Sequence, residues 1–179
     1  ELFQTQVRGL PAPGAYGVGM VFLPQDAGRR LWCERALDKC FAEEGLQTIA
    51  WRDVPVRPEA VGNLGRSMMP FIRQVFVGCG RTGPENLDRH LFVARKLSEN
   101  EVRKNGGEGA RHFYLPSCSS SVIVYKGLMR SFRVARFYPD LEDSLCRSAL
   151  ALVHQRYSTN TFPAWPLAQP FRFISHNGE

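Results

Sequence analysis

The sequence lacks a long apolar run, and it lacks any pair of cysteines separated by two residues. A transmembrane helix needs about 20 consecutive apolar residues, so we expect no contact with a membrane. The five cysteines are an odd number without metal-ligand spacing, which argues against both a zinc ribbon and a disulfide framework. We expect buried, reduced cysteines, as is usual in the cytosol.

Concentrated positive charge is also absent. The formal net charge is +6, but the basic residues are scattered, and the densest groups are the pairs Arg29-Arg30, Arg95-Lys96 and Arg103-Lys104. There is no basic block and no aromatic–basic motif of an RNA-binding sheet. The charge therefore indicates a solvated basic surface, and we expect no nucleic-acid partner.

Three familiar site signals are missing or incomplete. The serines between Ser117 and Ser121 have no Gly-x-Ser-x-Gly elbow around them and no base that can be paired with them, so we interpret them as turn and edge-strand residues. Gly17 and Gly19 lie inside an apolar segment, not after it, which indicates close backbone packing instead of a dinucleotide loop. His154 and His176 have no third ligand, so we predict packed histidines and no metal site.

What is present is enough for one domain of 179 residues with a core of its own. The periodicity predicts helices and strands in alternation. The predicted strands are 16–23, 47–52, 70–77, 113–118, 120–126, 149–153 and 171–175; the predicted helices are 26–44, 85–104 and 128–137; and 57–67 is irregular or a short helix. This order permits a parallel α/β fold as well as a layered α+β fold, and the pattern alone does not choose between them.

Polar side chains follow both of the last two predicted strands. Arg156 comes shortly after 149–153, and its guanidinium offers a planar fork of donors suited to a carboxylate. Asn177 and Gly178 come after 171–175, and they offer a side-chain amide and an unshielded backbone N–H, the donors of an oxyanion hole. On the residues alone, two other interpretations stay open: a strand-end salt bridge for Arg156, and a type I′ turn for the Asn-Gly pair.

The same stretch resembles a known family. Arg-Tyr-Ser-Thr-Asn-Thr-Phe-Pro from Arg156, then Ala-Gln-Pro, then His-Asn-Gly-Glu at the end, is similar to the class II glutamine amidotransferase domain of the glutamate synthases. Earlier segments resemble the same domain. They are Tyr-Gly-Val-Gly-Met-Val-Phe-Leu-Pro from Tyr16, Trp-Arg-Asp-Val-Pro from Trp51, Pro-x-Ile-x-Gln-x-Phe-Val from Pro70 and Val-Tyr-Lys-Gly from Val124.

This resemblance implies the fold of the N-terminal nucleophile hydrolases, an α+β sandwich of four layers, αββα. The family hydrolyses glutamine with an N-terminal cysteine whose own α-amino group serves as its base. This chain begins with Glu1 and ends shortly after Gly178. We therefore expect residues 1–179 to be a partial amidotransferase domain, incomplete at both ends, lacking the nucleophilic cysteine and inactive alone.

The resemblance also implies the roles of the site residues. Arg156 would bind the α-carboxylate of glutamine, Thr159 would add a hydrogen bond to it, and Asn177 with Gly178 would form the oxyanion hole. The ammonia would pass to 2-oxoglutarate on a synthase domain of the same polypeptide. The parent enzyme would use FMN and an iron–sulfur cluster, neither held by this chain, in the cytoplasm or, in a plant or alga, the plastid. The alternative is a non-catalytic glutamine-binding module that lacks the nucleophile.

Overall fold

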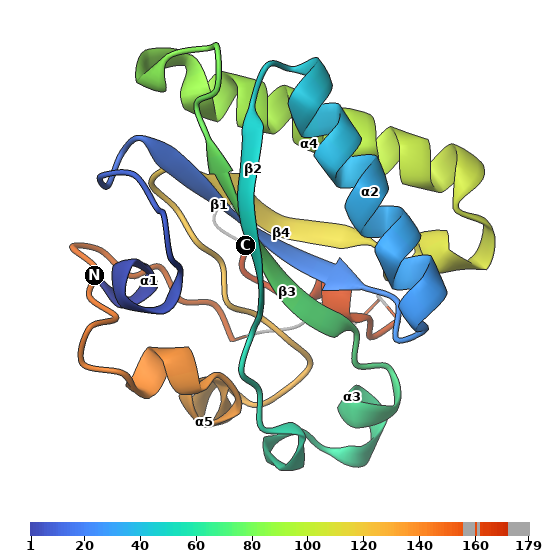
Figure 1. Cartoon of the computed structure of the whole chain (residues 1–179). Coiled ribbons are helices and arrows are strands. Elements are labelled where there is room, and N and C mark those ends of the chain that lie inside the picture. The colour runs from blue at the N-terminus through green and yellow to red at the C-terminus, as the bar shows by residue number, and fades with distance from the viewer. Residues whose placement is uncertain (156–159, 161, 172–179) are drawn as a thin grey trace.

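A four-stranded antiparallel sheet forms the centre of the molecule, which is described here by a computed structural model over residues 1–155, 160 and 162–171 (Figure 1). The strand order is β2-β3-β1-β4. The strands are β1 (Tyr16–Leu23), β2 (Gln47–Asp53), β3 (Phe71–Gly78) and β4 (Tyr114–Ser119). Every neighbouring pair is antiparallel, so the fold is a layered mixture of helices and strands and not a parallel α/β fold.

The central strand β1 is almost entirely buried, and two glycines set how closely its neighbours approach. A Cβ atom at Gly19 would lie 2.6 Å from Cγ1 of Val75 on β3, and one at Gly17 would collide with Cδ1 of Leu91. Real Cβ atoms do not approach other atoms this closely. The prediction that these glycines serve close packing is therefore confirmed.

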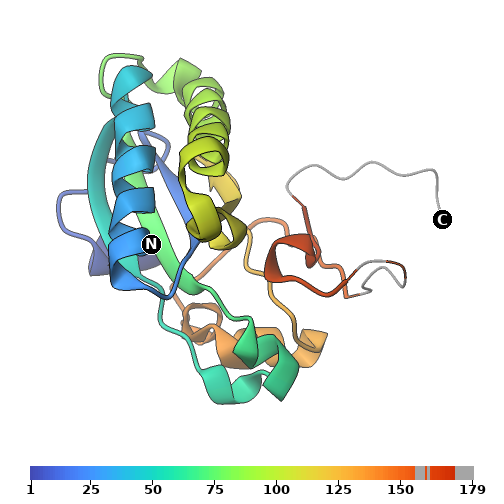
Figure 2. The ribbon, with the colours of Figure 1, turned by 90° about the vertical axis from the view of Figure 1, so that its right-hand side faces the viewer.

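Two long helices, α2 (Ala27–Glu43) and α4 (Leu87–Asn105), cover one face of the sheet (Figure 2). The Asp26 carboxylate caps α2 by accepting the Arg29 N–H at 2.8 Å, and Gly45 ends the helix with a φ of 75°. Their inward side chains include Leu37, Phe41 and Leu91, which form the larger core with the sheet.

The cysteines divide between the core and the surface. Cys33 and Cys40 on α2 are buried in the core, as predicted, and Cys118 on β4 is buried with them. Cys79 is half-buried and Cys146 is exposed, so the expectation of five buried cysteines was wrong for these two.

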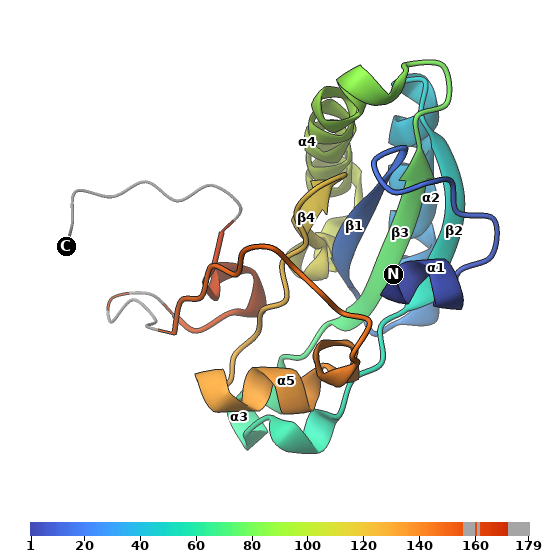
Figure 3. The same ribbon diagram turned by 90° about the vertical axis from the view of Figure 1, so that its left-hand side faces the viewer.

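The opposite face of the sheet is covered by short helices and loops (Figure 3). Three short helices lie on this face: α1 (Leu2–Gln6), α3 (Asn63–Ser67) and α5 (Val134–Phe137). Four 3₁₀ turns accompany them, at Pro58–Ala60, Ser131–Arg133, Pro139–Glu142 and Trp165–Leu167. Phe22 of β1 packs edge-on against Trp165, with ring centroids 5.9 Å apart. This second core also holds Phe137 and Tyr138. No second sheet lies on this face within the described residues.

The predicted strand 120–126 does not form, and serine hydroxyls explain why. The Ser119 hydroxyl accepts the Ser121 and Val122 N–H groups at 3.2 and 3.3 Å, and the Ser117 hydroxyl accepts the Val124 N–H at 3.0 Å. These N–H groups would otherwise have formed a ladder with β4. Side-chain hydroxyls compete with sheet hydrogen bonds in this way, so the prediction of a hairpin was wrong.

The apolar run 149–153 was predicted as a buried strand, and it is neither buried nor a strand. Leu150 is 83% exposed and Val153 is 86% exposed. The run is not part of the four-stranded sheet, and among the described residues no neighbouring strand supplies backbone partners or covers its side chains. His154, predicted to be packed, is exposed. Of the predicted strand 171–175, all but Phe171 lies outside the described residues.

The predicted helix 128–137 is confirmed only in its last part, as the turn Ser131–Arg133 and α5.

Searched over the described residues, no helix combines the length and apolar character needed to cross a membrane.

Candidate functional site

Four residues carry the predicted glutamine site, and all four lie outside the described residues: Arg156, Thr159, Asn177 and Gly178. Whether they converge on one cleft stays a prediction. The structure does describe the segments next to them in the sequence, which are 150–155 and 162–171. These two segments define the surroundings of the predicted site.

A cavity of about 650 Å³ lies where these segments meet. Its walls come from three stretches of the chain, 125–131, 152–155 and 168–170, with Pro163 and Val134 between them. The lining is mainly apolar, with Ser131 and Gln155 among its polar groups. Gln155, which lines the cavity, directly precedes Arg156 in the sequence. Arg156 is the residue predicted to bind the carboxylate.

Lys126 contributes an unusual buried amine beside this cavity. The residue is 2% exposed, and its Nζ donates to the Pro166 carbonyl at 2.8 Å and to the Tyr114 hydroxyl at 3.4 Å. Burial, and to a lesser degree the positive charge of Arg95, lowers the pKa of Lys126 to about 7. Sequence analysis did not select this residue, although it lies inside the Val-Tyr-Lys-Gly segment.

A buried polar network fixes the neighbouring residue, Tyr125. Arg52 donates to both carboxylate oxygens of Asp140, at 2.8 and 2.6 Å, and to Oε1 of Gln74 at 2.7 Å. The Tyr125 hydroxyl donates to Asp140 at 3.1 Å and accepts from Gln74 at 3.3 Å. Burial, with a smaller effect of the Asp140 charge, raises the pKa of Tyr125. The network ties the segment after β4 to β2 and β3.

Two further hydrogen bonds hold this region against the sheet. Tyr138 donates from its hydroxyl to the Lys126 carbonyl at 2.8 Å, and both groups are buried. Trp165 donates from its indole to the Gly65 carbonyl at 2.8 Å. The residues beside the cavity are thus positioned by α3, α5 and the turn at Trp165–Leu167. Sequence spacing gave no signal for these contacts, because their partners are distant along the chain.

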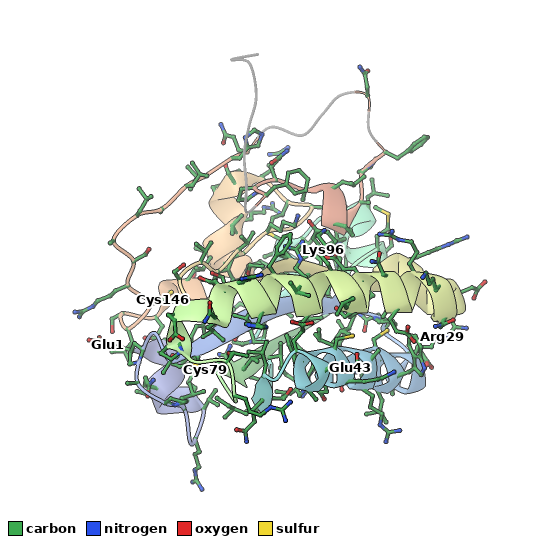
Figure 4. The ribbon with its side chains drawn as sticks, turned by 90° about the horizontal axis from the view of Figure 1, so that it is seen from above. Glu1, Arg29, Glu43, Cys79, Lys96 and Cys146 are labelled. Carbon is green, nitrogen blue, oxygen red and sulfur yellow. The ribbon has the colours of Figure 1, made fainter. Side chains whose placement is uncertain are left out.

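Three of the described thiols, those of Cys33, Cys40 and Cys146, are poorly suited to nucleophilic attack at neutral pH. Burial, with the nearby Glu34 carboxylate, raises the pKa of Cys33 to about 11, and burial also raises the pKa of Cys40 and of Cys146. The thiolate is the attacking form, so these thiols react slowly. Cys79 and Cys146 lie toward the end of the molecule where Glu1 lies (Figure 4).

In the serine cluster after β4, Ser120 has a structural role. Ser120 donates from its backbone N–H and its hydroxyl to the Asp88 carboxylate at 2.9 and 3.0 Å, which closes the turn after β4.

Over residues 1–155, 160 and 162–171, no group of three histidine, cysteine, aspartate or glutamate side chains could hold a metal ion.

Comparison with known proteins places this chain among named relatives. It is 44% identical over 164 residues to "Ferredoxin-dependent glutamate synthase 1, chloroplastic/mitochondrial" of Arabidopsis thaliana, a match that covers 91% of this chain and 10% of the relative. It is 44% identical over 172 residues to "Glutamate synthase [NADPH] large chain" of Bacillus subtilis, covering 95% of this chain and 11% of the relative. It is 42% identical over 181 residues to "Ferredoxin-dependent glutamate synthase 2" of Synechocystis, covering 100% of this chain and 11% of the relative.

These matches span about a tenth of the length of each relative. The sequence profile of the family described as "Glutamine amidotransferases class-II" matches residues 1–179, the whole chain. The resemblance found in the sequence motifs is confirmed, and this chain belongs to the class-II glutamine amidotransferases.

Proposed function

We propose that this chain is the glutamine amidotransferase part of a glutamate synthase. It would hydrolyse glutamine to glutamate and ammonia, and the ammonia would pass to 2-oxoglutarate on a synthase domain of the same polypeptide. The observation that carries this proposal is the family match over residues 1–179, together with 42–44% identity to glutamate synthases from a plant and two bacteria.

The substrate site of this proposal is formed by residues of the last segment of the chain. The Arg156 guanidinium binds the α-carboxylate of glutamine through two parallel N–H donors, and Thr159 adds a hydrogen bond. Asn177 and the Gly178 N–H stabilise the oxyanion that forms when a thiolate attacks the side-chain amide. Ammonia leaves, and water then hydrolyses the thioester to glutamate.

The nucleophile of this reaction is the N-terminal cysteine of the parent. The raised pKa values of Cys33, Cys40 and Cys146 support this assignment, because they disfavour an internal thiolate. The same observation favours the second candidate for the chain by itself, a module that binds glutamine without hydrolysing it.

The four-layer αββα sandwich is the proposed fold of the complete domain. The described sheet, with α2 and α4 on one face, would supply two of the layers. Support for the other two comes from apolar side chains of the run 149–153 that are exposed: Leu150 is 83% exposed and Val153 is 86% exposed. A second sheet packed on this side would bury them.

FMN and an iron–sulfur cluster belong, in this proposal, to the synthase part of the parent, where they supply electrons for the reduction. Within the described residues, no donor set of this chain fits a metal or cluster, so no step is assigned to these groups here. We place the parent in the cytoplasm, or in the plastid of a plant or alga, since names of several plant relatives include the word chloroplastic.

The test is steady-state kinetics on the complete parent enzyme with glutamine and, separately, with an ammonium salt. Asn177→Ala removes an oxyanion donor and should lower glutamine-dependent turnover about 100-fold or more, while leaving ammonia-dependent glutamate formation unchanged. Asn105→Ala, at the exposed end of α4, is the matched control and should change neither rate. A wild-type parent that forms no glutamate from glutamine would overturn the proposal.

A further inference from the structure

Lys126 has a buried amine to which the proposed mechanism gives no role. The chain has four lysines, and Lys39, Lys96 and Lys104 are exposed. Lys126 is 2% exposed, although lysine is almost never fully buried unless its charge is paired. No salt bridge to Lys126 is formed within the described part of the chain.

The amine joins three segments that are far apart in the sequence. Its Nζ donates to the carbonyl of Pro166 in the turn Trp165–Leu167 at 2.8 Å, and to the hydroxyl of Tyr114 on β4 at 3.4 Å. It also lies 4.6 Å from the ring centroid of Tyr114 and 4.6 Å from that of Phe171. Aromatic faces attract a cation at this distance, so one side chain links the sheet, the turn and the residue at which the last segment begins.

The groups facing Lys126 are mostly neutral or positive. From α4, the nearest charge is that of Arg95, which is paired with Glu99 at 2.9 Å. From β4 comes Tyr114, whose own pKa is raised by burial. His154 lines the same cavity as Lys126, and Tyr138, the residue after α5, donates from its hydroxyl to the Lys126 carbonyl.

On the far side of the turn, Arg111 and His112 share a small cavity with Pro166, which accepts the hydrogen bond from Lys126.

We propose that Lys126 is a positioning residue for the oxyanion hole: its amine holds the turn Trp165–Leu167 and the Phe171 ring against β4. This inference rests on the proposed function. Phe171 precedes Asn177 by six residues (177 − 171), so fixing Phe171 fixes the point from which the chain continues toward both oxyanion donors. Such donors work only when they are held within about 0.5 Å of the productive geometry.

Protonation of Lys126 has opposing effects: the ammonium is attracted by the two rings, but its burial costs more than this attraction returns, so the neutral amine is favoured. The pKa near 7 places that change at neutral pH. Unfolded lysine titrates near 10.4, so the unfolded state binds more protons between about pH 7 and that value. The contribution of Lys126 to the free energy of unfolding therefore rises with pH across this window.

The first experiment measures the contacts in the 179-residue chain itself. In carbon-13 NMR, the Cε resonance of Lys126 should titrate near pH 7. The Trp165 indole N–H resonance should move with the Lys126 midpoint, and this movement should vanish in Lys126→Met but persist in Lys96→Met. All proteins carry His112→Gln, because His112 and Trp165 line one cavity. A Trp165 resonance indifferent to Lys126→Met would overturn the inference.

The second experiment measures function in the complete parent. Lys126→Met should lower kcat with glutamine at least tenfold while KM stays within about threefold, because oxyanion donors act in the transition state. Lys126→Arg keeps a donor and a positive charge and should recover kcat to within about threefold of wild type. Lys96→Met should have no effect, and ammonia-dependent synthesis should be unchanged throughout.

The outcomes separate the two proposals. Equal loss with both nitrogen sources, or unchanged glutamine turnover in Lys126→Met, would overturn the role of Lys126 and leave the proposed function standing. A wild-type parent without glutamine-dependent activity would overturn the proposed function and the positioning role together, whatever the NMR titration gives.

Discussion

Gly19 lies where β1 passes closest to β3, and the space there admits no side chain. The nearest heavy atom to a Cβ would be Cγ1 of Val75 at 2.6 Å. Val75 is fully buried, and its branched side chain has few alternative rotamers. The contact therefore cannot be relieved by moving a flexible side chain.

Gly19→Ala should lower the free energy of unfolding by about 1–3 kcal/mol, the usual cost of overpacking a core. Gly28→Ala on α2 is the matched control, since its Cβ would meet nothing closer than Asp26 Oδ1 at 3.4 Å. The control should equal wild type or exceed it by up to about 1 kcal/mol. Urea unfolding of the three proteins provides the comparison, and a Gly19→Ala midpoint equal to that of wild type would contradict the packing argument.

At the scale of elements, the Arg52–Asp140 ion pair connects β2 to the 3₁₀ turn Pro139–Glu142 across 88 residues of sequence. Both side chains are largely buried, at 13% and 2% exposed. Burying two charges costs free energy that their mutual attraction only offsets when the geometry is good. Here the pair is bidentate, and Gln74 and Tyr125 complete the hydrogen bonding.

Asp140→Asn should lower the free energy of unfolding by about 3–5 kcal/mol, because it leaves the Arg52 charge buried without a counter-charge. Glu142→Gln is the control: it breaks a pair of similar length, Arg57–Glu142 at 2.7 Å, whose side chains are 44% and 45% exposed. An exposed pair contributes about 0–1 kcal/mol, so the control should change little. If both variants lose the same small amount in chemical denaturation, the network does not stabilise this face.

The sequence pattern predicted correctly those helices and strands whose formation depends on signals within the segment itself. The strand 16–23 and the helix capped by Asp26 were found as predicted, because an apolar run stopped by Pro24, a capping carboxylate and a stop glycine are local signals. The segments 120–126 and 149–153 were mispredicted as strands. A strand exists only where a neighbour accepts its hydrogen bonds, and that depends on residues far along the chain.

The candidate site shows the same division. Family motifs pointed to Arg156 and to the Asn177-Gly178 pair, whose positions lie outside the described residues. They gave no indication that Lys126 contacts Pro166, 40 residues away, or that Gln74 and Tyr125 join one network across 51 residues. A glutamine in the middle of an apolar strand, as at Gln74, is the one sequence signal that could have suggested a buried polar partner.

At the scale of the whole molecule, the proposed enzyme has two nitrogen sources, and only one of them needs this chain. In this proposal, glutamine would be bound and hydrolysed in the amidotransferase domain, whereas free ammonium would reach the synthase domain without it. A substitution that acts on glutamine binding alone should therefore separate the two activities in the complete parent.

Arg156→Lys tests this separation. Arginine gives a carboxylate two parallel N–H donors, while lysine gives a compact point charge on a flexible stem. The α-carboxylate is remote from the bond that breaks, so its contact is similar in the ground and transition states, and its loss should mainly raise KM for glutamine. A charge-assisted hydrogen bond contributes about 1.5–3 kcal/mol, which predicts a loss of roughly 10- to 150-fold in kcat/KM. Arg147→Lys, at an exposed arginine that bonds the Ser144 carbonyl, is the control and should leave kcat/KM unchanged. Steady-state rates with glutamine and with ammonium decide the matter: an equal fall with both would make Arg156 a structural residue, because no residue of a glutamine pocket limits the use of free ammonium.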